Sequence, residues 1–128
     1  MYIILANGAT LSPINIIGAK KIVQNATRDT LSFIFQGDAS LDELDRIFTA
    51  TNCETITIVD GDNEYVHAGY TVRYELKRSS VEVAPATEST DAEYENRVTV
   101  AMAQRTYMES QIASLTDTVD MLVLESLL

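Results

Sequence analysis

The alternation of apolar and polar residues in the segment GYTVRYELK is the feature that most restricts how this chain can fold. From Tyr70 to Lys77, two tyrosines, Val72 and Leu76 occupy one set of alternate positions, and polar or charged residues occupy the other. Successive side chains of a β-strand point to opposite faces of its sheet, so this period of two is typical of a strand. The segment therefore predicts an antiparallel sheet with one covered and one solvated face.

The same period predicts further strands on both sides of this segment. The apolar positions that define them are Leu31, Phe33 and Phe35 in DTLSFIFQ, Ile56 and Ile58 in ETITIVD, and Val98, Val100 and Met102 in NRVTVAMAQ. A hairpin is expected at Asn7-Gly8, which stands between two apolar runs, because this dipeptide tolerates the positive φ of a tight turn.

One internal segment, ASLDELDRIFTA, has the spacing of a helix. Leu41, Leu44, Ile47 and Phe48 fall on one helical face, and Ser40 is a suitable N-cap. We therefore expect an α+β fold: a mainly antiparallel sheet with one short packed helix and a long C-terminal helix.

The chain divides into three expected parts. Residues 1–83 are expected to form the antiparallel sheet domain with its short helix. Residues 84–95 are an expected acidic linker or loop, because the stretch APATESTDAE lacks large apolar residues and contains a proline. Residues 96–128 are expected to contain a returning strand and a C-terminal association helix.

The C-terminal stretch QRTYMESQIASLTDTVDMLVLESLL carries an apolar seam. Met108, Leu115 and Leu122 take the d positions of a heptad, and Ile112 and Val119 take the a positions. Val123 and Leu124 widen the apolar surface at the end of the expected helix, Arg105–Ser126. An isolated helix of this length is marginal in water, so something must cover the seam. The alternatives are the chain's own sheet domain, other copies of the chain, and a partner helix.

Composition excludes several classes of protein. The formal net charge is −10, from 19 acidic and 9 basic residues, so nucleic acid and anionic membrane surfaces are not expected partners. Cys53 is the single cysteine, which rules out an internal disulfide. The apolar N-terminus has no preceding basic region, so no signal peptide is expected, and no apolar run is long enough to span a bilayer.

No combination of residues predicts catalysis, a cofactor or a metal site. The segment DGDNEYVHAGYT resembles the opening of a calcium loop, but Tyr65 and Thr71 stand where that loop needs glycine and glutamate. A solvated hairpin turn is therefore the expected structure. His67 and Cys53 are the only residues of their types, and together they do not fill a zinc shell. We expect no enzyme activity.

Four segments of the sequence resemble a known group of proteins. These are RDTLSFIF, then LDELDRIFTATNCETITIVD followed by GYTVRYELKR, and finally RVTVAMAQRTYMESQIASLTDTVDMLVLESLL. They are similar to the small tail-associated or baseplate structural proteins encoded by prophages of Gram-positive bacteria. The resemblance implies a non-catalytic virion protein without a cofactor, located in the phage tail and assembled in the bacterial host cytoplasm. Its implied partners are itself, as a homo-oligomer, and other phage tail proteins.

Two other classes of function remain open at this point. An intracellular adaptor or assembly chaperone would dock the C-terminal helix into a groove of a partner protein. An enzyme that uses His67 would need a pocket around it, with Cys53 or an acidic group nearby.

Overall fold

The computed structural model describes the backbone of residues 1–127, and their side chains except at positions 113, 116, 117, 120 and 123–127. The elements are β1 (Tyr2–Leu5), β2 (Thr10–Leu11), β3 (Asn15–Val23), β4 (Ala26–Gln36), α1 (Leu41–Ile47), β5 (Thr55–Asp60), β6 (Asn63–Ala68), β7 (Val72–Ala84), β8 (Glu93–Ala103) and α2 (Tyr107–Leu127).

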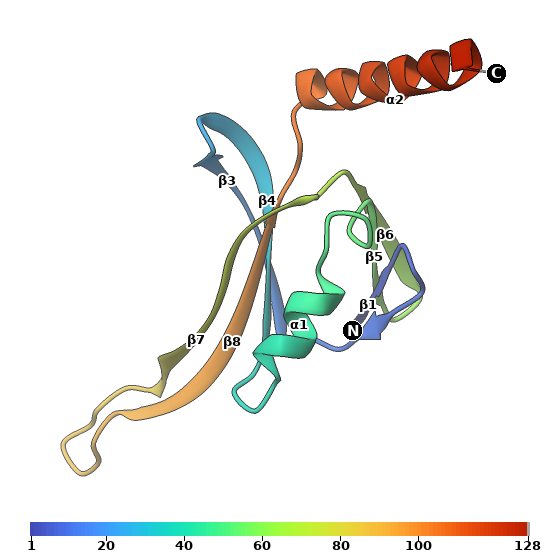
Figure 1. Cartoon of the computed structure of the whole chain (residues 1–128). Coiled ribbons are helices and arrows are strands. Elements are labelled where there is room, and N and C mark those ends of the chain that lie inside the picture. The colour runs from blue at the N-terminus through green and yellow to red at the C-terminus, as the bar shows by residue number, and fades with distance from the viewer. Residues whose placement is uncertain (128) are drawn as a thin grey trace.

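The strands form two antiparallel sheets of four strands each. Their orders are β2-β1-β5-β6 and β3-β4-β8-β7, and Figure 1 shows α1 beside the sheets and α2 apart from them. The prediction of an α+β fold with a long C-terminal helix is wrong, because the described chain is mainly antiparallel β-structure and its helices are a minor part. Sheet packing on sheet, rather than helix packing on sheet, builds most of the interior.

A single hydrophobic cluster joins the two sheets. Strands β1 and β5 supply Ile3 and Ile56, and strands β4 and β8 supply Phe33 and Val100 among others, all fully buried. Helix α1 closes this cluster with Leu44 and with Phe48, which caps its C-terminus. The predicted apolar faces of β4 and β8 are confirmed, because Leu31, Phe33, Phe35, Val98, Val100 and Met102 are all buried.

Several local predictions are also confirmed. The hairpin at Asn7-Gly8 joins β1 to β2, and Gly8 has a φ of +87°. The acidic stretch after β5 is a tight hairpin turn, in which Asp60 pairs with Asn63 across Gly61 and Asp62. Ser40 caps α1, since its hydroxyl accepts a hydrogen bond of 3.3 Å from the backbone N–H of Glu43.

The alternation in β7 predicted that Arg73 lies on the solvated face of the sheet, and this prediction is wrong. The pairing of β7 with β8 shifts register between Arg73 and Glu75, so Tyr74 is an extra residue, as in a β-bulge. Arg73 pairs with Met102 and Leu76 pairs with Val100, and both partners are buried in the core. Arg73 therefore belongs to the core side of the sheet, where its guanidinium contacts α1 through the backbone oxygen and carboxylate of Asp45.

The expected linker lies at the far end of the β7–β8 hairpin. Strand β7 continues to Ala84 and β8 begins at Glu93, so residues 85–92 connect two paired strands. The returning strand expected after the linker is β8, which lies between β4 and β7. The division into a domain, a linker and an association segment stays a prediction.

Candidate functional site

The apolar seam of α2 is exposed along its described length. The exposed fractions are 72% for Met108, 58% for Ile112, 63% for Leu115, 54% for Val119 and 59% for Leu122. Val123 and Leu124 were predicted to join this surface, and their side chains lie outside the described residues. The described seam residues thus present a line of large apolar side chains to solvent rather than packing on the sheets.

The first turn of α2 is held by a reciprocal pair of hydrogen bonds. The backbone N–H of Glu109 donates to the Thr106 hydroxyl at 3.2 Å, and the Thr106 N–H donates to the Glu109 carboxylate at 2.8 Å. This is the capping box that the pattern Thr-x-x-Glu produces, and it satisfies two backbone donors that a helix start otherwise leaves without partners. The backbone oxygen of Thr106 accepts from Ser110, so the helix begins directly after Thr106.

A buried arginine attaches this capping box to the second sheet. The Arg28 side chain on β4 is only 2% exposed, and its guanidinium forms a two-pronged ion pair with the Glu109 carboxylate. Its Nε donates to the backbone oxygen of Val23 at 2.8 Å, and Nη1 donates to that of Gln104 at 3.3 Å. One side chain therefore connects the β3–β4 turn, the end of β8 and the start of α2. We call Arg28, Gln104, Thr106 and Glu109 the α2 joint.

The electrostatics of the joint favour the ionised carboxylate. Hydrogen bonding from Arg28, and then from the Thr106 backbone, lowers the pKa of Glu109 from 4.5 to about 2. The carboxylate is therefore charged at neutral pH, which keeps both prongs of the ion pair in place.

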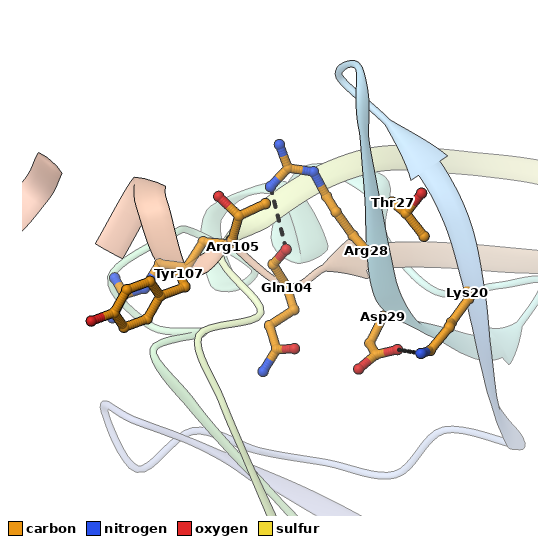
Figure 2. A pocket seen from close by; sticks show the side chains of 8 residues that line it. Lys20, Thr27, Arg28, Asp29, Gln104, Arg105 and Tyr107 are labelled. Atoms are coloured by element: carbon orange, nitrogen blue, oxygen red, sulfur yellow. Dashed lines mark hydrogen bonds and ion pairs between the residues drawn. The ribbon is translucent and has the colours of Figure 1, made fainter. Parts of the chain in front are cut away.

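A cavity of about 300 Å³ lies beside the joint, between β3, β4 and the start of α2 (Figure 2). The charged groups at this cavity pair with other groups of the same chain. Lys20 lies 4.0 Å from the Asp29 carboxylate, and Arg105 lies 3.0 Å from that of Glu54. These pairs reduce the positive charge that faces the cavity, which favours a structural role for the cavity itself. The Lys20 side chain nevertheless stays 77% exposed.

Sequence reasoning missed the joint. Neither Glu109 nor Arg28 is among the residues predicted to take part in a site. The pattern Thr106-x-x-Glu109 before an apolar run is a recognised sign of a helix start, and it would have placed the start of α2 correctly. No local signal identifies Arg28, because its partner Glu109 is 81 positions away.

The two residues considered for nucleophilic catalysis lie in different environments. Cys53 is fully buried in the core cluster, and burial raises the pKa of its thiol to about 12, which disfavours the reactive thiolate. His67 lies on the edge strand β6 and is half-buried. Its ring packs edge-on against Tyr70, with the ring centroids 5.7 Å apart. A thiolate at Cys53 is thus not available for the chemistry of a Cys–His pair.

Within the part of the chain that the structure describes, no group of three or more His, Cys, Asp or Glu side chains has a geometry that could hold a metal ion. Neither described helix combines the length and the apolar character needed to cross a membrane.

Comparison of the chain with protein-family models, with curated proteins and with solved structures finds no match.

Proposed function

We propose that this chain is a non-catalytic structural subunit of a phage tail or baseplate, which assembles with other copies of itself through the apolar seam of α2. The observation that carries the assembly part is the exposure of Met108, Leu115, Val119 and Leu122, each more than half accessible to solvent. Contiguous exposed apolar surface of this kind marks an interaction site in a soluble protein. The phage location rests on the resemblance of the sequence to prophage tail proteins.

The energetics support association of the seam. Each large apolar side chain that is about half exposed in the monomer stabilises a complex by about 1 to 2 kcal/mol when the partner covers it. Four or five such side chains on each copy exceed the entropy cost of ordering them, provided that the helix is held in place before binding. The α2 joint supplies that restraint, because Arg28 and the capping box fix the first turn of the helix to the second sheet.

The charge of α2 bears on the kind of assembly. Its sequence from Tyr107 to Leu127 contains Glu109, Asp117, Asp120 and Glu125 and no lysine or arginine. Copies of this helix therefore cannot form complementary ion pairs with one another, and association must depend on apolar packing. Association through apolar packing alone favours a bundle of helices in which the acidic faces point outward.

Two measurements on the full chain test the proposal. Sedimentation velocity over a wide range of protein concentration should show oligomers, and mass spectrometry of particles purified from an induced host should find the chain in a fixed ratio to other tail proteins. A protein that stays monomeric at high concentration would contradict self-assembly. A chain that oligomerises but is absent from purified particles would contradict the virion assignment. A monomer that co-purifies with a single partner outside particles would favour the adaptor class.

A further inference from the structure

The β7–β8 hairpin extends beyond the rest of its sheet as a two-stranded arm. The last pair between β4 and β8 is Gln36 with Arg97, whereas β7 and β8 continue to pair as far as Ala84 with Glu93. Figure 1 shows this hairpin projecting away from the body of the protein. We call residues 80–96 the arm. A two-stranded ribbon without a third strand or a covering helix is marginally stable in water, so the arm gains from a partner.

The surface of the arm is both apolar and acidic. The exposed fractions are 37% for Val81, 42% for Val83 and 61% for Tyr94. The sequence from 80 to 96 contains five acidic residues, Glu82, Glu88, Asp91, Glu93 and Glu95, and no lysine or arginine. Glu95 forms an ion pair with Arg97, directly outside the arm, so the other four supply the charge for a partner. A partner for this surface must therefore offer apolar side chains together with positive charge.

Strand β3 of the same sheet offers that combination. Ile17 is 48% exposed and Ile22 is 79% exposed, and Lys20 and Lys21 lie between them. The sequence from 14 to 23 contains no acidic residue, and the ion pair between Lys20 and Asp29 of β4 is long, at 4.0 Å, and leaves the Lys20 side chain 77% exposed. In the described sheet, β3 is an edge strand that pairs only with β4, so its other edge presents backbone groups that can pair with a further strand.

The two surfaces lie at opposite ends of one sheet. The arm continues past Gln36 of β4, whereas the lysines of β3 pair with Arg28 and Asp29 near the other end of β4. Figure 1 shows the β3–β4 turn and the arm at opposite ends of the sheet. The arm of a chain therefore cannot reach its own β3, but it can reach that of a neighbouring copy placed end to end.

We propose that the acidic arm of one copy docks against the basic end of β3 in a second copy. The contact joins two different surfaces, so each copy has one of each, and repetition gives a ring or a fibre rather than a closed two-fold dimer. It uses no residue of α2, and it is therefore a second assembly contact that is independent of the seam. Charge complementarity between the arm and β3 identifies the occupant as another copy of this chain.

Reciprocal charge reversal in the full-length chain tests the contact. All chains carry Leu115→Ser and Leu122→Ser, which removes association through the seam. One chain adds Lys20→Glu and Lys21→Glu, so that arm and β3 are both acidic. The other adds Glu82→Lys and Glu93→Lys, so that the arm is less acidic and gains positive charge opposite a basic β3. Each is expected to associate at least about tenfold more weakly than the parent in sedimentation velocity. In the first chain two acidic surfaces meet, and in the second the attraction between the arm and the lysines of β3 is largely lost.

An equimolar mixture of the two reversed chains should restore association, since the unchanged acidic arm of the first chain meets the unchanged lysines of β3 in the second. Raising the ionic strength should weaken the parent contact, because salt screens exposed charge pairs. A matched control carries Asp62→Lys and Glu64→Lys at the β5–β6 turn, which changes the net charge by the same amount as the arm substitutions. It should associate like the parent.

Three results would contradict the proposed contact between the arm and β3. If both reversed chains associate like the parent, or if the mixture stays as weakly associated as its components, the proposal is wrong. The same holds if the control weakens association as strongly as the arm substitutions. Circular dichroism verifies that each chain is folded. Should Lys20→Glu/Lys21→Glu prove unfolded, Lys20→Gln/Lys21→Gln replaces it. Mixing this chain with the arm-reversed chain should again restore association, because the first keeps its acidic arm and the second keeps its lysines.

Discussion

Arg28 and Glu109 lie 81 positions apart in the chain and form a two-pronged ion pair that attaches α2 to the second sheet. The arginine side chain is almost completely buried, whereas the glutamate side chain is 41% exposed. This contact helps to determine where the exposed seam of α2 lies. The Arg105 backbone N–H, which donates to the Gly69 oxygen at 2.8 Å, and the Arg105–Glu54 ion pair hold the segment before α2 as well.

Replacing Glu109 by glutamine should lower the free energy of unfolding by about 1 kcal/mol. The neutral amide loses the charge-assisted bonds to Arg28, and solvent screening at the partly exposed carboxylate keeps the effect near this value. Arg28→Ala should lower it by about 2 kcal/mol, because the backbone oxygens of Val23 and Gln104 also lose their donor. Urea denaturation measures both effects. As a control, Glu54→Gln at the more exposed Arg105 pair should change stability by less than about 0.5 kcal/mol. Equal losses in Glu54→Gln and Glu109→Gln would contradict the special role of the joint.

Acid should release the first turn of α2. The pKa of Glu109 is lower in the folded state, about 2 against 4.5. Its contribution to stability is therefore fully present above pH 4.5 and is lost as the pH falls from 4.5 toward 2. Hydrogen exchange of the backbone amides of Thr106 and Glu109 should accelerate, relative to the core strands, across this window. In Glu109→Gln, the protection of these backbone amides from hydrogen exchange should already be low at pH 6. It should not fall further, relative to the core strands, between pH 4.5 and pH 2. Parallel pH profiles in both proteins would exclude Glu109 as the titrating group.

Seam substitutions should reduce association without destabilising the monomer. Leu115→Ser and Leu122→Ser each remove an exposed apolar side chain from the d positions, so each should weaken self-association about tenfold. Their effect on monomer unfolding should stay within about 0.5 kcal/mol, because exposed positions contribute little to folding. Met121 is 63% exposed but lies outside the a and d positions, and Met121→Ser serves as the matched control. An equal effect of Met121→Ser would show that the contact is broader than the seam.

Gly37→Ala should destabilise the base of the arm. A Cβ added at Gly37 would lie 2.5 Å from the backbone oxygen of Asn96, and a backbone atom cannot move aside cheaply. We expect a loss of about 2 kcal/mol in thermal or urea unfolding. Gly18→Ala in β3 is the control, because the nearest atoms to its added Cβ are 3.9 Å away. That substitution should be neutral or slightly stabilising. A neutral Gly37→Ala would show that β8 shifts readily at the base of the arm.

Cys53 should resist alkylation in the folded protein. Burial raises the pKa of the thiol to about 12, and the side chain is fully inaccessible. Iodoacetamide at pH 8 should therefore react at least about a hundredfold more slowly with the native chain than with the chain in urea. Mass spectrometry of timed samples measures the ratio. Comparable rates would mean that the core around Cys53 opens frequently.

Local order was predictable from the residues themselves. The period of two in β4 and β8, the Asn7-Gly8 turn and the Ser40 cap each depend on neighbours a few positions away. The amino-acid sequence alone therefore determined that β4, β5, β7 and β8 are extended, which segment forms α1, and that an apolar seam exists near the C-terminus.

Only the tertiary structure decided how these segments combine. The division of the strands into two sheets, the bulge at Tyr74, the free arm and the anchoring of α2 by Arg28 all depend on partners far away along the chain. Side-chain periodicity reports which face of a segment is apolar, but not which distant segment covers it. The fold class was predicted wrongly for this reason, since sheet packing on sheet and helix packing on sheet require the same apolar strand faces.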